Sequence, residues 1–274
     1  MDTQELVLGK STVYSDEYSS ALLQRIERRL GREQIKHLQK FKGVDIWHLY
    51  EMTYLNLQGM PCVCMGIMKV PSHSDYIVES KSLKLYELSF TQTKFRDLET
   101  VEKVFERDLS RLLECDVTVE LYEVTTKNFA INKVKGTCLE KSAACRNLVI
   151  SEYTYNPKLL SLSESKELVS ETLYTNLFRS LCPVTSQPDH ATISVEYRGN
   201  QIDKAALLKY FISLRNHQGF HEQCVELIYS DIMYYLKPDV LTVSANFTRR
   251  GGIDINPVRS NTFLHAISSR TVRQ

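Results

Sequence analysis

The chain has 274 residues, 43% of them hydrophobic and 24% charged, which is typical of a globular protein with a substantial core. Its 34 lysines and arginines nearly balance 33 aspartates and glutamates, so a net charge of +1 gives no general attraction to nucleic acid or to a membrane surface. No signal peptide or membrane-spanning apolar run is visible, so we expect a cytoplasmic protein whose seven cysteines are reduced thiols.

The first half of the chain begins with a polar arm and then predicts the order strand, strand, helix, helix, strand. The clearest helix has apolar residues at three- and four-residue steps from Val101 to Leu113. A strictly alternating strand follows it, at Val117 to Leu121. The predicted elements are strands over residues 44–57, 61–70 and 117–121, and helices over 82–90 and 100–114.

The second half predicts the same order of elements. Ile193, Val195 and Tyr197 alternate on one face of a strand, and Asp203 is placed to cap the helix that follows. The predicted elements are strands over residues 168–179, 191–197 and 241–247, and helices over 203–214 and 221–236.

This repeated order indicates a duplicated unit and an α+β fold, with antiparallel sheets that carry their helices on one face. A polar, irregular stretch separates the two halves. We therefore predict an N-terminal arm over 1–42, a first repeat over 43–141, a linker over 142–166 and a second repeat over 167–274.

Several common cofactor motifs are absent from the sequence. The ten glycines show no GxG spacing, so neither the dinucleotide-binding fingerprint nor the phosphate-binding P-loop is present. No HExxH or paired CxxC zinc signature occurs either. The residues alone therefore give no indication of a nicotinamide cofactor.

The segment from Ser180 to Asp189 combines a cysteine with a carboxylate between two predicted strands. Two prolines restrict its backbone. Cys182 is a candidate nucleophile, with Asp189 as its partner in proton transfer. The alternative is a half-buried structural cysteine with a turn aspartate, since free cysteine usually packs as a small hydrophobe.

His221 and Glu222 open the last long helix. They are a candidate proton donor and a candidate acceptor of ligand hydrogen bonds, although glutamate in a first turn is also favourable with the helix dipole. Together with His217 and Cys224, His221 has a spacing conceivable for a metal. Gly219 interrupts that helical face, so we expect no metal.

Two further segments are suited to an anion. The residues Val78 to Tyr86 place hydroxyls and lysines at a helix start, where backbone N–H groups favour phosphate; the alternative is a capped, solvated helix start. The segment Arg249-Arg250-Gly251-Gly252 follows a strand and is suited to bidentate phosphate binding, or is a charged turn with flexible glycines.

In this order, the motifs resemble the long, two-repeat form of NADPH-dependent 7-cyano-7-deazaguanine reductase (QueF), of queuosine biosynthesis in tRNA modification. The resemblance covers nearly the whole chain and is weakest around 142–163. Its strongest motif is Glu79-Ser80-Lys81-Ser82-Leu83-Lys84-Leu85-Tyr86; the segments from Ser180 to Asp189, Phe220 to Glu222 and Arg249 to Asn256 also match.

The resemblance implies a tandem tunnelling fold (T-fold) of two ββααββ-type repeats, which binds NADPH without a Rossmann domain and forms a homodimer. It implies that two NADPH reduce the nitrile of a deazapurine to an aminomethyl group, through a thioimide on Cys182. Asp189 and His221 would take part in proton transfer. Val78, Glu79, Ser80, His221 and Glu222 would bind the substrate, and Ser80, Lys81, Arg250 and Gly251 the NADPH.

Two other functions stay open at this stage. One is a zinc-dependent enzyme related to GTP cyclohydrolase, which the missing ligand cluster disfavours. The other is a T-fold that binds a purine-like ligand without turnover, which the intact set of Cys182, Asp189 and His221 disfavours. The family pattern suggests that Glu79 of the first repeat shares a pocket with Cys182 of the second, but spacing alone does not bring them together.

Overall fold

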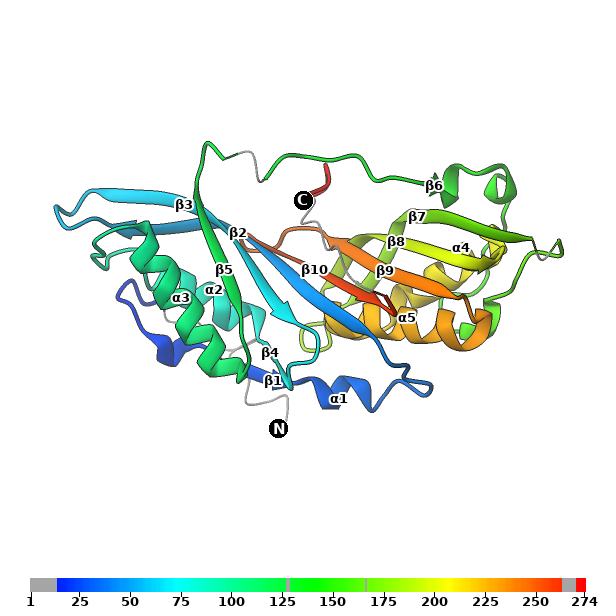
Figure 1. The fold of residues 1–274 in the computed structure, drawn as a ribbon, viewed down its shortest axis with the longest axis horizontal. Coiled ribbons are helices and arrows are strands. Elements are labelled where there is room, and N and C mark those ends of the chain that lie inside the picture. The colour runs from blue at the N-terminus through cyan, green and yellow to red at the C-terminus, as the bar shows by residue number, and fades with distance from the viewer. Residues whose placement is uncertain (1–13, 127–128, 166, 263–269) are drawn as a thin grey trace. The chain divides into compact units, whose positions relative to one another are not determined.

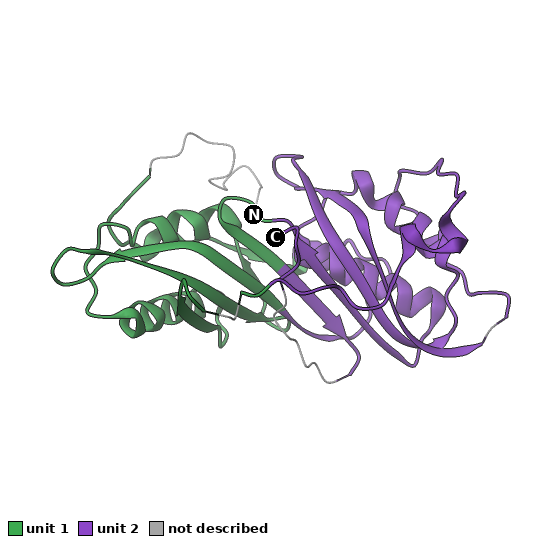
Figure 2. Ribbon diagram, turned by 90° about the horizontal axis from the view of Figure 1, so that it is seen from above, with its two compact units in different colours: residues 1–29, 45–130, 249–255 green, residues 30–44, 131–248, 256–274 purple. Residues whose placement is uncertain are grey.

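The computed structural model describes residues 14–126, 129–165, 167–262 and 270–274, which form two compact units. Unit 1 contains the chain up to Arg29, Asp45–Ala130 and Arg249–Ile255, and unit 2 contains Leu30–Val44, Ile131–Thr248 and Asn256–Gln274 (Figure 2). The strands Lys42–Leu55 and Ile253–Ser260 each contain residues of both units, because the divisions after residues 44 and 255 fall within them.

Unit 1 is a twisted antiparallel sheet with two helices against one face (Figure 1). Its strands follow the order β5-β3-β2, and the first residues of β10 come next. A separate ladder pairs β1 with β4. The elements are β1 (Arg25–Glu27), β2 (Lys42–Leu55), β3 (Pro61–Pro71), β4 (Tyr76–Val78), α2 (Ser80–Leu88), α3 (Leu98–Leu113) and β5 (Thr118–Glu123).

Unit 2 repeats this plan, with the order β10-β9-β8-β7-β6 and two helices on one face (Figure 1). All its strand pairs are antiparallel except the two-residue pairing of β6 with β7. The elements are β6 (Thr137–Cys138), β7 (Leu168–Leu181), β8 (Pro188–Asn200), α4 (Lys204–Ser213), α5 (His221–Leu236), β9 (Val240–Phe247) and β10 (Ile253–Ser260). The short helix α1 (Arg28–Arg32) begins in unit 1 and ends in unit 2.

The apolar faces predicted from the sequence are the faces that form the two cores. In unit 1, Val101, Phe105 and Leu109 of α3 are fully buried in one cluster. In unit 2, Ile193 and Val195 of β8 are fully buried in the other. The predicted α+β fold, with antiparallel sheets and helices on one face, is confirmed.

Local capping explains where two of these helices begin. The carboxylate of Asp203 accepts hydrogen bonds from Ala205 N at 2.8 Å and Ala206 N at 3.0 Å, as the sequence predicted. The carboxylate of Asp97 caps α3 in the same way, by accepting from Thr100 N at 2.8 Å. Both aspartates satisfy backbone N–H groups that have no partner inside the helix.

The two halves differ at their last strand. In unit 2, β9 is followed by β10, which completes the order strand, strand, helix, helix, strand, strand. In the described residues between β5 and β6 no corresponding strand occurs. In unit 1 the first residues of β10 lie next to β2 instead, and Tyr50 N donates a hydrogen bond of 3.0 Å to Gly252 O.

Candidate active site

Cys182 lies in a tight loop that joins β7 to β8. The hairpin register pairs Leu181 with Pro188 and Ser180 with Asp189. The loop is closed by two backbone hydrogen bonds of 2.9 Å, from Cys182 N to Gln187 O and from Ser186 N to Cys182 O. With 4% of its surface exposed, Cys182 is held at the base of this loop rather than at its tip.

Asp189 and His221 meet on the helix side of the same hairpin. Asp189 lies at the start of β8, directly opposite Ser180, and only 8% of its surface is exposed. His221 begins α5, and its Nε2 lies 3.4 Å from Asp189 Oδ2. The two residues are 32 positions apart in the chain, so the pairing depends on α5 packing against the sheet.

The imidazole of His221 is oriented by an aromatic ring that sequence analysis did not single out. Phe247, the last residue of β9, stacks on His221 with ring centroids 3.8 Å apart and planes inclined by 9°. Because Phe247 is fully buried, it fixes the plane of the imidazole. Nδ1 of His221 is buried and has no hydrogen-bond partner among the described residues. The ring therefore has one nitrogen toward Asp189 and one available for another group.

Glu222 and Cys224 follow His221 in the first turn of α5. Both are buried, with 4% and 1% of their surfaces exposed. Burial raises the pKa of the Cys224 thiol to about 12, and the nearby Asp189 and Glu222 charges add to this increase. Cys224 therefore stays a protonated thiol at neutral pH and is a poor nucleophile. The sequence had placed it in a conceivable metal set.

That metal set is not assembled in the described part of the chain, where no group of three histidine, cysteine, aspartate or glutamate side chains is arranged to hold an ion. Gly219 lies between the histidines and precedes α5, as its position in the sequence indicated. A Cβ atom at Gly219 would meet His217 Nε2 at 3.1 Å and Cys224 Sγ at 3.3 Å. A larger residue here would require these neighbouring side chains to shift by a few tenths of an ångström.

In unit 1, Glu79 caps the helix that carries the strongest sequence motif. Its carboxylate accepts hydrogen bonds from Lys81 N at 2.9 Å and Ser82 N at 2.7 Å, at the start of α2. Glu79 is 2% exposed, and its own backbone N–H donates to Gln24 O. The capped-helix interpretation is therefore right, although the start is buried at Glu79 rather than solvated. These two N–H groups already have an acceptor, so an anion here would depend on the side chains of Ser80 and Lys81.

Glu87, in the last turn of α2, is a buried carboxyl with one oxygen, Oε1, that has no hydrogen-bond partner in the described structure. Burial raises its pKa to about 7, although Lys84 Nζ, 3.3 Å from Glu87 Oε2, acts in the opposite direction. Between pH 4.5 and about 7 the folded state thus binds more protons than the unfolded chain. The contribution of Glu87 to stability therefore falls as the pH rises through this window.

We expect Glu87→Gln to remove this part of the pH dependence. The free energy of unfolding of the variant minus that of wild type should increase by roughly 2–4 kcal/mol from pH 4 to pH 8, as measured by urea unfolding. Glu99→Gln, at an exposed position on α3, is the matched control and should give a curve parallel to wild type. The prediction would be contradicted if the free energy of unfolding of Glu87→Gln and that of wild type changed with pH in parallel.

The turn that contains Arg250 and Gly251 is exposed and rests on a polar cluster at the start of β10. Two backbone hydrogen bonds close the turn, one from Arg250 N to Ile253 O at 2.9 Å and one from Ile253 N to Arg250 O at 3.2 Å. Gly251 has a φ of 60°, and a Cβ atom there would have no neighbour within 4 Å, so its surroundings are open. Gly252, with a φ of 78°, is packed against the side chain of Glu51.

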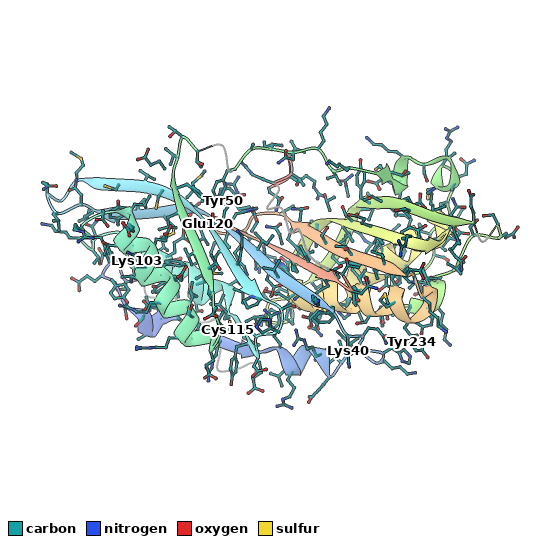
Figure 3. The ribbon with its side chains drawn as sticks, in the orientation of Figure 1. Lys40, Tyr50, Lys103, Cys115, Glu120 and Tyr234 are labelled. Atoms are coloured by element: carbon teal, nitrogen blue, oxygen red, sulfur yellow. The ribbon has the colours of Figure 1, made fainter. Side chains whose placement is uncertain are left out.

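Asp254, the residue that follows this turn, is the centre of the polar cluster. Its carboxylate is bound by His48 Nδ1 at 2.7 Å and by Tyr50 Oη at 2.6 Å, and all but about 1% of Asp254 is buried. The guanidinium carbon of Arg249 lies 4.2 Å from the centre of the Tyr50 ring, a cation–π contact; Tyr50 is labelled on β2 in Figure 3. Sequence analysis missed Asp254, Tyr50 and His48, because no local motif connects residues about 200 positions apart.

The structure therefore divides the predicted site residues between its units. Unit 2 brings together Asp189 and His221, with Glu222 next in the chain and Cys182 in the adjoining loop. Unit 1 holds the segment from Val78 to Lys81 and also Arg250 and Gly251. That Glu79 shares a pocket with Cys182 stays a prediction.

Two family models match the chain. Residues 14–121 match the model described as "Nitrile reductase, 7-cyano-7-deazaguanine-reductase N-term", and residues 188–264 match the model of the QueF-like proteins. A solved structure of the apo form of an archaeosine synthase, QueF-Like, matches with 23% identity over 35% of this chain and 96% of its own, with a TM-score of 0.30. That likeness is too low to add to the argument.

The fold and the matched segments define a nitrile-reductase-type α+β protein in two parts. Together the two models account for about two thirds of the sequence, and they lie in the order that the duplicated elements predict. The chain belongs to the QueF family, and this family membership indicates an enzyme of the queuosine pathway. In the described residues no helix is long and apolar enough to cross a membrane.

Proposed function

We propose that this protein is an NADPH-dependent reductase that converts 7-cyano-7-deazaguanine to 7-aminomethyl-7-deazaguanine, with Cys182 as its nucleophile. The observation that carries the proposal is the arrangement in unit 2. A cysteine held by a closed hairpin loop adjoins an Asp189–His221 pair of 3.4 Å, in a chain of a nitrile reductase family. A nucleophile with adjacent proton-transfer groups is the requirement for covalent catalysis.

The first chemical step needs only these residues. The sulfur of Cys182 forms a bond to the nitrile carbon, and the carbon–nitrogen triple bond becomes a double bond. The thiol proton is transferred to the nitrile nitrogen, so the product is a neutral thioimide. A carboxylate next to a thiol raises the pKa of the thiol, so Asp189 does not activate Cys182 electrostatically. We therefore assign to Asp189 the role of relaying this proton. His221 is placed to donate or accept the same proton.

The substrate requires acceptors for the adjacent N–H groups of its deazaguanine ring. Glu222 is a buried carboxylate at the start of α5, next to His221, and offers two oxygens side by side. Glu79 accepts one backbone hydrogen bond at each oxygen, which leaves further lone pairs for a ligand. We assign Val78, Glu79, Ser80, His221 and Glu222 to substrate binding.

NADPH would supply hydride, two per nitrile, since reducing a nitrile to a primary amine takes four electrons. The residues of unit 1 fit a phosphate-bearing group in two places. The turn at Arg250 and Gly251 is exposed, and its open side at Gly251 allows close approach of a ligand. Ser80 and Lys81 are partly exposed at the start of α2. We assign these four residues to NADPH binding.

The direct test is NADPH oxidation by the purified full chain with 7-cyano-7-deazaguanine, followed by absorbance. The proposal predicts two NADPH consumed per nitrile, with no loss of activity in the presence of a chelator. Activity lost to the chelator, with stoichiometric zinc in the protein, would indicate the cyclohydrolase-like alternative. Tight binding of the deazapurine without turnover would indicate a silent binding protein.

Asp189→Asn should lower kcat by roughly a hundredfold or more, because the amide cannot accept and return the thiol proton. The matched control is Asp203→Asn, where an asparagine can still cap α4, and its turnover should equal that of wild type. A fully active Asp189→Asn enzyme would remove Asp189 from the mechanism. Steady-state assays at saturating substrate and NADPH make the comparison.

A further inference from the structure

Two basic side chains face each other on the side of the unit 2 sheet that carries no helices. Arg179 of β7 and His190 of β8 are direct cross-strand partners, so their side chains project from the same face. Their chain neighbours Ser180, Asp189 and Ala191 are buried. Because side chains alternate along a strand, Arg179 and His190 lie on the opposite, open face.

The C-terminal residues bring a third basic side chain to this face. Gln274 is buried there, and its Nε2 donates a 2.6 Å hydrogen bond to Asn256 Oδ1, while its Oε1 accepts from Asn246 Nδ2 at 3.1 Å. The preceding residue, Arg273, donates from Nη1 to Asn176 O at 2.7 Å. Asn176 precedes Arg179 by three positions on β7, and the charge of Arg273 acts on the imidazole of His190, so Arg273 lies at the same part of the hairpin as the pair.

These three side chains form no ion pair with a carboxylate within the described ranges, whereas many arginines of this chain do. Arg273 and His190 are exposed and Arg179 is partly exposed. The pKa of His190 is lowered, first by partial burial and then by the charges of Arg273, Arg179 and Arg215. The paired arginines are Arg25, Arg28, Arg29, Arg32, Arg96, Arg107 and Arg259.

We propose that Arg179, His190 and Arg273 form a phosphate-binding site on the open face of unit 2. Guanidinium groups match the geometry of phosphate oxygens with paired N–H donors, and an imidazole adds one more donor. The two arginines compensate the two charges of a phosphate monoester. The phosphate is either the 2′-phosphate of a pyridine nucleotide, which rests on the proposed function, or free inorganic phosphate, which does not.

Calorimetric titration of the full chain with inorganic phosphate, 2′,5′-ADP and 5′-ADP tests the site. Arg179→Gln and Arg273→Gln should each weaken binding of inorganic phosphate or of 2′,5′-ADP about tenfold or more, since a charge-assisted hydrogen bond contributes roughly 1.5 kcal/mol or more. Arg198→Gln is the matched control. It replaces another exposed arginine of β8, on the same face and eight residues further along, and should leave binding unchanged.

The three ligands separate the two sources of phosphate. If the variants bind 2′,5′-ADP more weakly than wild type does but bind 5′-ADP equally well, the site binds the 2′-phosphate of the cofactor. Weaker binding of inorganic phosphate alone assigns it to a free anion. If wild type binds none of them, or if both variants bind like wild type while circular dichroism shows them folded, the site is excluded. A chain that binds phosphate here but oxidises no NADPH would overturn the proposed function and leave this site standing.

Discussion

Replacing Cys182 with alanine should abolish NADPH oxidation, with a fall in kcat of about a thousandfold or more, because the step that forms the sulfur–carbon bond loses its nucleophile. Substrate binding should persist, since the residues assigned to it are separate side chains. The measurement is steady-state turnover, together with calorimetric binding of 7-cyano-7-deazaguanine in the absence of NADPH.

The other cysteines provide the control for this prediction. All seven are free thiols, and burial raises the pKa of both Cys64 and Cys224 to about 12. Cys62→Ala, a partly exposed position in unit 1, should leave turnover unchanged. Turnover that survives in Cys182→Ala, or that is lost equally in Cys62→Ala, would contradict the assignment of the nucleophile.

Glu226→Gln should be the most destabilising single substitution considered, at a cost of about 3–5 kcal/mol in the free energy of unfolding. Glu226 is buried on α5 and accepts from Arg32 Nε and Nη2 at 2.9 and 2.8 Å, and from Arg259 Nε and Nη2 at 3.1 and 2.9 Å. Arg259 has no exposed surface. Removing the negative charge of Glu226 takes away the carboxylate that the Arg32 and Arg259 guanidinium groups share.

Urea unfolding at neutral pH measures this cost. Glu114→Gln is the matched control, because it breaks the exposed ion pair of Arg25 and Glu114 and should cost less than about 1 kcal/mol. A loss below about 1 kcal/mol for Glu226→Gln would show that the two arginines are stabilised by their other contacts, such as the Phe41 ring 5.4 Å from each guanidinium carbon.

The helices and most strands could be predicted from the sequence because their periodicity is regular and long. The last helix begins at His221 and ends at Leu236, as predicted, since its apolar positions keep helical spacing over four turns. The strand β10 was missed for a physical reason. It contains Pro257 and four buried polar residues, Asp254, Asn256, Arg259 and Ser260, so its burial is not visible as apolar alternation.

The site was predictable only in part. The hairpin that holds Cys182 and Asp189 follows from two strands around a proline-containing loop, and the helix start at His221 follows from periodicity. That Asp189 contacts His221, and that Phe247 stacks on the imidazole, depends on tertiary packing between distant segments. The sequence offered a capped start of this helix as the alternative to an anion site, but it did not identify Glu79 as the capping residue.

The intact mass of the protein after incubation with 7-cyano-7-deazaguanine, without NADPH, tests the central claim most directly. We predict an added mass of one nitrile molecule, located by peptide mapping on Cys182, absent in Cys182→Ala and discharged when NADPH is added. The account would be contradicted if wild type consumed two NADPH per nitrile without forming an adduct and the Cys182→Ala variant kept the same turnover.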